Sequence, residues 1–414
     1  MTISTPIRPG RTLSGAAPRR AALRWEGLAL GGMLTVFVLI DLLLRPRFVA
    51  VNVDSEATSH FVPPIVSILH LAINILIIVP PVLLAFRTRT NFRLVGTYIL
   101  IALGIVFTAI ISLFGAGDSH PLPYVLILLL TFSGAALFAA SQYGRERGFC
   151  DFMAATAIGC GIALLLAIAF NEYDWGRLSS RAGPTYWGMV AIMCFSTSFA
   201  VRPRWLRAAL ILIVAVSLVL TSARGAMIAV VVSASAICAI TIARAPPSRR
   251  GWLVGGLILL AIALPLIGYF VANDLMVISD PRRGLSSGAT GRALAWAQAW
   301  NLFTSHPFFG IGYRRHEQFI TVATSAHEAY LAVLAELGSV GFLLYILLIV
   351  GGALKITVEA LRSRDAGSAS GAAFLWSYMS IGFTENLALA TGLVMPLAMI
   401  FVTARAWAGG AAKR

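Results

Sequence analysis

The chain is poor in charged residues. Only 12% of its 414 residues are Asp, Glu, Lys or Arg, whereas soluble domains carry about 25%. Hydrophobic residues make up 58%, and apolar runs near the length of a membrane crossing recur with short polar breaks between them. This composition excludes a soluble globular protein and indicates an integral membrane protein.

Cysteine is also scarce, and no internal repeat is visible. The four cysteines, Cys150, Cys160, Cys194 and Cys238, fall in or beside apolar runs without paired spacing. This pattern argues against a disulfide framework or a cysteine-based metal site, and it predicts buried thiols. The lack of two matching six-helix halves argues against a symmetric transporter.

The apolar runs predict an all-α integral membrane protein with about twelve transmembrane helices. One large external loop, 273–326, separates the ninth helix from the tenth. The last two helices are open to another interpretation, because they could form one broken hairpin around Glu385 and Asn386. The predicted helices lie near 24–44, 61–86, 92–114, 122–140, 149–170, 185–201, 205–221, 225–243, 252–272, 327–354, 371–384 and 388–407.

The distribution of basic residues predicts the orientation of these helices. With a cytoplasmic N-terminus, every inner segment carries at least two Lys or Arg, as the positive-inside tendency requires. Residues 1–23 are then a basic, disordered cytoplasmic segment, 24–408 the membrane domain, and 409–414 a cytoplasmic tail. The first apolar run is too long for a cleaved signal. The net charge of +15 mostly reflects topology, so no nucleic-acid partner is expected.

Ten basic residues remain on the predicted outer side, where the positive-inside tendency disfavours them. Headgroup anchoring explains the first two, and an anionic lipid-linked substrate is a natural partner for the others. The ten are Arg45, Arg47, Arg177, Arg181, Arg224, Arg282, Arg283, Arg292, Arg314 and Arg315.

Two of these arginines stand in distinctive local sequences. Arg224 lies in a turn of almost no length between two apolar runs, and Gly225 permits a close approach there. Arg292 falls in the first turn of a predicted amphipathic helix, where backbone N–H groups favour anions. The alternatives are an arginine that reaches lipid headgroups at 224 and a solvated helix face at 292. Diphosphate binding is the preferred interpretation of Arg224. His306, which precedes a proline in a turn, is expected to be structural.

His327 opens the predicted tenth helix directly after the large loop. With Tyr330, Leu331 and Leu334 it forms one helical face. A titratable imidazole at this position suits proton transfer or acceptor binding, although a structural hydrogen bond at the helix end is the alternative. Glu336 is about 180° away around the helix and cannot orient His327. Gly338 and Gly341, further along, suit tight helix contact.

A rival site involves Asp54 and Glu56 in the first predicted external loop. Two carboxylates at this spacing could hold a divalent metal. Acidic pairs are common in loops, however, and solvated charge is the simpler interpretation.

Taken together, four segments resemble the O-antigen ligase/polymerase superfamily of bacterial inner-membrane enzymes. They are S-A-R-G at 222–225, T-G-R-A-L-A-W at 290–296, H-P-F-F-G-I-G-Y at 306–313 and A-H-E-A-Y-L-A-V-L-A-E-L-G-S-V-G at 326–341. Two departures stand out. Family members usually have Asn after the motif histidine, where this chain has Glu328, and many have a Pro-Asn pair where this chain has Gly183–Trp187.

The resemblance implies a metal-independent, inverting glycosyl transfer from an undecaprenyl-diphosphate-linked glycan at the periplasmic face of the inner membrane, without a cofactor. Arg224 and Arg292 would stabilise the diphosphate, and His327 would activate the acceptor hydroxyl. Glu385 would orient His327 or an arginine. The supporting substrate-binding candidates are Arg181, Arg314, Arg315 and Tyr330.

The acceptor stays open at this stage. A repeat-unit polymerase would use a glycan acceptor and a ligase a lipid-core acceptor, and contact with a flippase or chain-length regulator fits either. A protein-glycosylating enzyme is disfavoured by the lack of large soluble domains. The alternative function is a lipid-linked glycan flippase or another transporter. It predicts charges at several mid-helix positions, whereas the ionisable residues here collect at the outer ends of the helices.

Overall fold

The computed structural model describes residues 25–45, 63–116, 122–145, 147–174, 176–252, 254–255, 292–321 and 327–409. Several predictions lie outside the described residues. These are the N-terminal segment 1–23, almost all of the ninth helix at 252–272, the loop as far as Gly291, the tail from 410 onward, Arg47, Arg282, Arg283, and the acidic pair Asp54 and Glu56.

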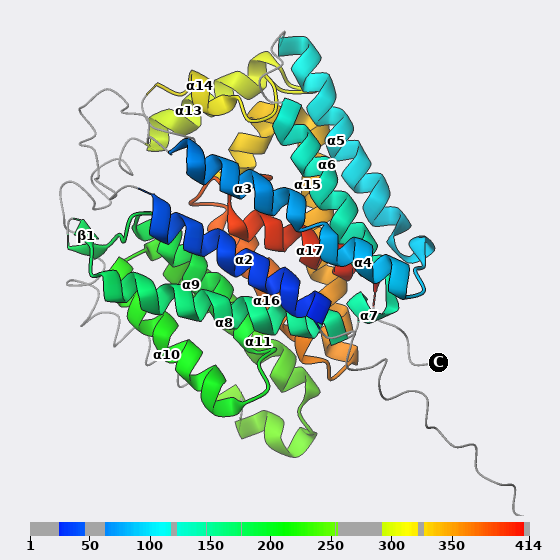
Figure 1. Cartoon of the computed structure of the whole chain (residues 1–414), viewed down its shortest axis with the longest axis vertical. Helices are drawn as coiled ribbons and strands as arrows, with labels where there is room; N and C mark the ends of the chain where they lie inside the picture. Colours follow the sequence, from blue (N-terminus) through cyan, green and yellow to red (C-terminus); the bar gives the residue numbers. More distant parts are fainter. Residues whose placement is uncertain are drawn as a thin grey trace, which may run out of the picture.

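The described chain is almost entirely helical (Figure 1). Its strands are one short antiparallel pair in which Tyr173 is opposite Leu178. In chain order the elements are α2 (Trp25–Leu44), α3 (Pro64–Leu76), α4 (Val79–Arg87), η1 (Phe92–Val95), α5 (Gly96–Ala116), α6 (Leu122–Ala140), α7 (Gln142–Arg145), α8 (Arg147–Phe170), β1 (Tyr173–Asp174), β2 (Arg177–Leu178), α9 (Pro184–Ser198), α10 (Arg204–Thr221), α11 (Arg224–Arg244), α13 (Arg292–Ser305), α14 (His316–Phe319), α15 (Ala329–Arg362), α16 (Ala366–Ile381) and α17 (Val394–Ala408).

Eight helical spans among the described residues are long and apolar enough to cross a membrane. This finding confirms the prediction of an all-α, multi-span membrane protein. The total of twelve helices and the placement of the large loop stay predictions, because the ninth helix lies largely outside the described residues. The second predicted helix is broken into α3 and α4. The break precedes Pro80 and Pro81, which lack the backbone N–H that would continue the helix.

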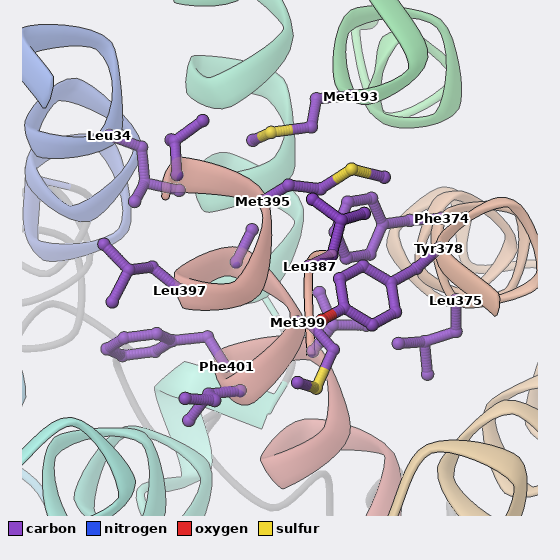
Figure 2. Packing of buried hydrophobic residues seen from close by; sticks show 14 of the residues in the cluster. Leu34, Met193, Phe374, Leu375, Tyr378, Leu387, Met395, Leu397, Met399 and Phe401 are labelled. Atoms are coloured by element: carbon purple, nitrogen blue, oxygen red, sulfur yellow. The ribbon is translucent and has the colours of Figure 1, made fainter. Parts of the chain in front are cut away.

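Three shorter helices form the interior of the molecule. All of α9 except Thr185 and all of α17 except Trp407 are buried, and most of α16 is buried too. Figure 2 shows side chains of α17 meeting Phe374 and Tyr378 of α16, Met193 of α9 and Leu34 of α2. By contrast, only 28% of the apolar stretch of α10 and 22% of that of α11 are buried. α9, α16 and α17 therefore lie at the centre, and α10 and α11 lie at the periphery.

The chain between α16 and α17 is irregular, and it will be called the 382–393 segment. The last two predicted helices are therefore two separate helices, but their bounds were wrong. Asp365 caps α16 by accepting from the N–H of Ser368, so this helix begins earlier than predicted. The apolar residues 387–393 are not helical, because side chains from other elements bind their carbonyl groups. Tyr378 Oη donates to Ala388 O at 2.5 Å and Tyr313 Oη to Leu389 O at 2.7 Å.

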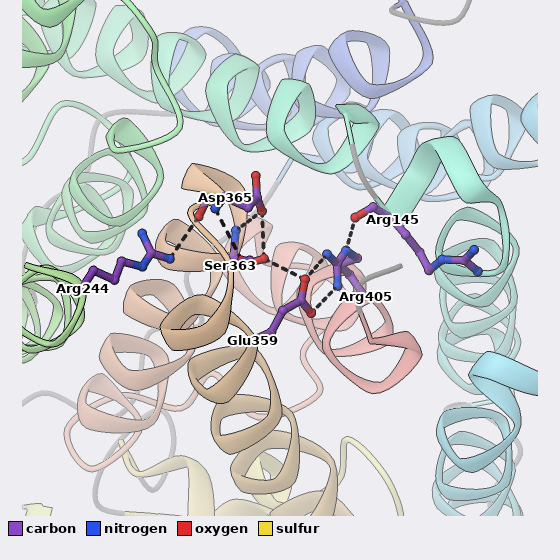
Figure 3. Close-up of polar contacts among 7 residues, drawn as sticks. Arg145, Arg244, Glu359, Ser363, Asp365 and Arg405 are labelled. Atoms are coloured by element: carbon purple, nitrogen blue, oxygen red, sulfur yellow. Dashed lines mark hydrogen bonds and ion pairs between the residues drawn. The ribbon is translucent and has the colours of Figure 1, made fainter. Parts of the chain in front are cut away.

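A polar cluster ties the helix ends together far from the 382–393 segment (Figure 3). Two nitrogens of Arg405 donate to the two carboxylate oxygens of Glu359 at 2.9 and 2.6 Å, and its third donates to the carbonyl of Arg145. Arg244 donates to Ala360 O at 2.6 Å. Basic residues that the charge pattern assigns to one side of the membrane therefore meet at one end of the structure.

We predict that Arg405→Ala destabilises the protein. The Arg405 side chain is 3% exposed, so its removal leaves the Glu359 carboxylate partly buried without its main partner. Loss of one partner of such a pair costs about 3–5 kcal/mol. Thermal unfolding in detergent measures the effect. Arg362→Ala, which truncates an exposed arginine at the end of α15, serves as the control. Equal melting temperatures for the two variants would contradict the prediction.

Candidate functional site

Glu385, in the 382–393 segment, lies between two of the predicted catalytic residues. Its Oε1 is 3.6 Å from Nη2 of Arg292, the first residue of α13. Its Oε2 is 3.9 Å from Nδ1 of His327, which lies just before α15. The two oxygens of one carboxylate therefore face a guanidinium and an imidazole that come from different parts of the chain.

The three side chains remain partly accessible. The exposed fraction is 28% for Arg292, 32% for His327 and 13% for Glu385. A second contact holds Arg292, because its Nη1 donates to the carbonyl of Thr384 at 3.1 Å. A partly buried guanidinium is costly unless it is paired, and Glu385 and Thr384 supply the pairing.

Arg224 approaches the same segment from another side. It is the first residue of α11 and is half-buried. A Cβ on the next residue, Gly225, would lie 2.3 Å from Oγ1 of Thr384, so only glycine permits this approach. The preceding turn is fixed by Arg177, whose Nε donates to Thr221 O at 2.7 Å. The close packing of Gly225 thus places the start of α11 against the side chain of Thr384, the residue before Glu385.

The prediction that His327 lies on a helical face with Tyr330 was wrong. The helix begins at Ala329, and His327 has a φ of 47°, outside the helical range. Glu328 is the N-cap, and its carboxylate accepts from the N–H groups of Tyr330 and Leu331. Glu328 therefore caps the helix at the position where the resemblance led us to expect Asn. Burial raises the pKa of Glu328, and the two N–H donors oppose that shift.

A glycine-rich loop holds the first part of α15 in place. Gly338 has a φ of 65° and interrupts the helix, which frees backbone groups for other partners. Ile311 N donates to Ala335 O at 2.9 Å, and Ser339 N donates to Pro307 O at 2.8 Å. A Cβ on Gly338 would lie 2.3 Å from the carbonyl of Phe308. Gly338 therefore permits contact with a loop, whereas the sequence had suggested contact with a helix.

A second histidine, which sequence reasoning missed, lies behind this site. His316 Nδ1 is 2.6 Å from Oε1 of Glu336, and both side chains are buried. His316 Nε2 is 3.2 Å from Nδ2 of Asn386, the residue after Glu385. The sequence did contain a signal, since a buried acid inside an apolar helix requires a partner, and Glu336 faces away from His327.

The supporting candidates are placed elsewhere. Arg181 donates to Leu43 O at 3.1 Å and pairs with Glu172 at 3.6 Å, so it fastens its loop to the end of α2. The hydroxyl of Tyr330 donates to Met379 O at 2.7 Å, which holds α15 against α16. These contacts occupy both side chains in the described structure.

Arg314 and Arg315 directly precede α14, which begins at His316. The Arg314 guanidinium is 6.0 Å from the ring centre of Tyr124, and that of Arg315 is 5.6 Å from the ring centre of Phe319. Burial lowers the pKa of Arg314, but the nearby carboxylates of Glu317 and Glu336 outweigh that effect and raise it. Arg314 thus belongs to the His316 network. This network reaches Asn386, which follows Glu385 in the chain.

The described part of the chain contains no group of three His, Cys, Asp or Glu side chains arranged to hold a metal ion. Asp54 and Glu56 lie outside it. The described site instead offers guanidinium groups for an anion and an imidazole beside a carboxylate for a proton. Such an arrangement suits reactions in which a polyanion leaves and a hydroxyl proton is removed.

Comparison with known proteins finds a family match that covers part of the chain. Residues 208–346 match the family model described as O-antigen ligase. That range includes Arg224, Arg292 and His327 but ends before Glu385 and Asn386. No curated protein matches the chain. The match at residues 208–346 supports the O-antigen ligase/polymerase superfamily for this part of the chain.

Proposed function

We propose that the protein is a glycosyltransferase that transfers a glycan from an undecaprenyl-diphosphate-linked donor to an acceptor hydroxyl. The observation that carries this proposal is the cluster of Arg292, Glu385 and His327, with the start of α11, where Arg224 lies, packed against the adjacent Thr384. The cluster combines a site for a diphosphate with a base for a hydroxyl. Its position at helix ends suits a donor whose lipid stays in the bilayer.

Arg292 and Arg224 would act on the leaving group. As the bond between the anomeric carbon and the diphosphate oxygen breaks, the electron pair passes to that oxygen, and negative charge grows on the diphosphate. Guanidinium groups stabilise such charge by bidentate hydrogen bonds without a metal or a proton donor. In the free protein Glu385 and Thr384 hold Arg292 in place, so the cation is positioned before the donor arrives.

His327 would act on the acceptor. Its neutral imidazole removes the proton from the acceptor hydroxyl while the oxygen attacks the anomeric carbon on the face opposite the diphosphate, which inverts that carbon. The imidazolium formed in this step lies 3.9 Å from the Glu385 carboxylate, which stabilises its positive charge. One carboxylate would therefore serve both halves of the reaction.

The site would face the periplasm of a bacterium, with the protein in the inner membrane and both chain ends in the cytoplasm. The charge distribution supports this orientation, since Arg145, Arg244 and Arg405 meet at the end where the positive-inside tendency expects them. Polymerisation of repeat units and ligation to a lipid core are both consistent with the site.

We predict that His327→Ala lowers transfer by about 10²–10⁴-fold, the usual contribution of a general base. Lipid-linked donor should accumulate on the periplasmic side of cells that carry the folded variant. His306→Ala is the matched control, because His306 is exposed and contacts Ser305 rather than the cluster. Donor trapped on the cytoplasmic side would instead indicate a flippase and contradict the proposal.

We predict that Arg292→Ala and Arg224→Ala each lower turnover by about 10²–10³-fold, because each removes charge stabilisation from the leaving group. Lys at either position should restore only part of the activity, since it lacks the bidentate geometry. Arg204→Ala is the control. Arg204 is exposed at the start of α10, whereas Arg224 follows the end of that helix, so this variant should be active.

Turnover should also persist in excess chelator. Loss of activity with chelator, together with loss on Asp54→Ala or Glu56→Ala, would favour the metal alternative. Purified protein, lipid-linked donor, and either repeat-unit or lipid-core acceptor give all of these measurements. They also separate polymerase from ligase.

A further inference from the structure

Asn386 is joined to a network that the proposed reaction does not use. It follows Glu385 directly, yet its side chain has different partners. Its Nδ2 lies 3.2 Å from Nε2 of His316 and 3.2 Å from Oε1 of Glu317. Glu385 thus faces Arg292 and His327, whereas the next residue, Asn386, contacts a buried histidine.

The partners of His316 determine where its proton lies. A carboxylate only accepts hydrogen bonds, so the 2.6 Å contact with Glu336 places the proton on Nδ1. The Asn386 amide must present its NH₂ group to Glu317, because its oxygen would repel that carboxylate. The same NH₂ group then donates to Nε2, which must be unprotonated. The chain of donors from Asn386 through His316 to Glu336 has one consistent direction.

This network spans the elements that build the site. Glu336 lies in α15 two residues before the break at Gly338, and the start of α15 follows His327. Asn386 lies one residue from the carboxylate that faces His327. His316 is 1% exposed and Glu336 5%, so the link between them is shielded from water. A buried polar pair adds little net stability compared with apolar packing, but it selects one geometry.

We propose that Asn386 is a positioning residue that sets the Glu385 carboxylate between Arg292 and His327, with His316 and Glu336 as its fixed support. This inference rests on the proposed glycosyl transfer. Asn386 does not touch the reacting groups. It acts by holding the backbone that carries Glu385, so its loss slows the chemical step more than it weakens binding of the lipid-linked donor, because Thr384 still holds Arg292.

Steady-state kinetics of the purified, full-length protein test the proposal. We expect Asn386→Ala to lower kcat by about tenfold to a hundredfold with little change in KM for the lipid-linked donor, the effect of misplacing a reacting group. The matched control is Asn74→Ala. Asn74 Nδ2 also donates to this segment, at Thr391 O and 3.1 Å, but away from Glu385. We expect the kcat of Asn74→Ala to stay within about twofold of the parent, because the proposal makes kcat depend on the position of Glu385 and Asn74 is bound elsewhere in the segment.

A double-mutant cycle shows whether Asn386 acts through Glu385. In a Glu385→Gln background, Asn386→Ala should have little further effect on kcat, because the carboxylate that it positions is absent. His316→Gln, whose amide oxygen can accept from Asn386, should retain more activity than His316→Leu. Melting temperatures of all variants distinguish loss of geometry from loss of fold.

Equal losses for Asn386→Ala and Asn74→Ala, or fully multiplicative effects in the cycle, would overturn the positioning role. The proposed function fails separately. It fails if the parent protein does not transfer glycan, or if Arg292→Ala and His327→Ala transfer it at the parent rate. If Arg292→Ala and His327→Ala lose activity as predicted but Asn386→Ala keeps the parent kcat, only the positioning role is rejected.

Discussion

A bilayer core supplies no hydrogen-bonding groups, so a membrane protein must satisfy its backbone internally. The candidate site depends on two places where this chain departs from regular helix. One is the break at Gly338 in α15, where the loop around Phe308 and Ile311 exchanges backbone hydrogen bonds with the helix. The other is the 382–393 segment, whose carbonyl groups are bound by Tyr313, Tyr378 and Asn74. Tertiary partners make irregular backbone tolerable here, and that backbone carries Glu385.

The second constraint is electrostatic. A partly buried arginine needs a partner, and a substrate anion can be that partner only while it is bound. Glu385 resolves this conflict, because its carboxylate pairs with Arg292 while also facing His327. In the proposed transfer, the group that holds Arg292 in the free protein would therefore influence both the leaving diphosphate and the imidazole. A bound diphosphate would compete with Glu385 for Arg292 and leave more of the carboxylate for His327.

The two ends of the molecule use charge differently. At the end formed by Arg405, Glu359 and Arg244, the hydrogen bonds are short. The Arg405 side chain is nearly buried, and these bonds hold helices together. At the opposite end the contacts of Glu385 are longer, and Arg292 and His327 keep about a third of their side-chain surface exposed. Tight pairing suits a structural role, whereas loose and accessible pairing leaves a substrate room to enter.

The sequence by itself determined the fold class, most helix positions and the motif residues Arg224, Arg292 and His327, because hydropathy, charge and local motifs are properties of neighbouring residues. It also marked Glu385 as a candidate. It could not find the His316–Glu336–Asn386 network, whose members are 20 and 70 residues apart, nor the role of Glu328 as a helix cap. It placed helix at 388–393, because an apolar run looks the same whether its carbonyl groups bind its own chain or side chains from elsewhere. Only the tertiary structure decided those partners, since hydrogen bonds between distant segments leave no periodic pattern in the sequence.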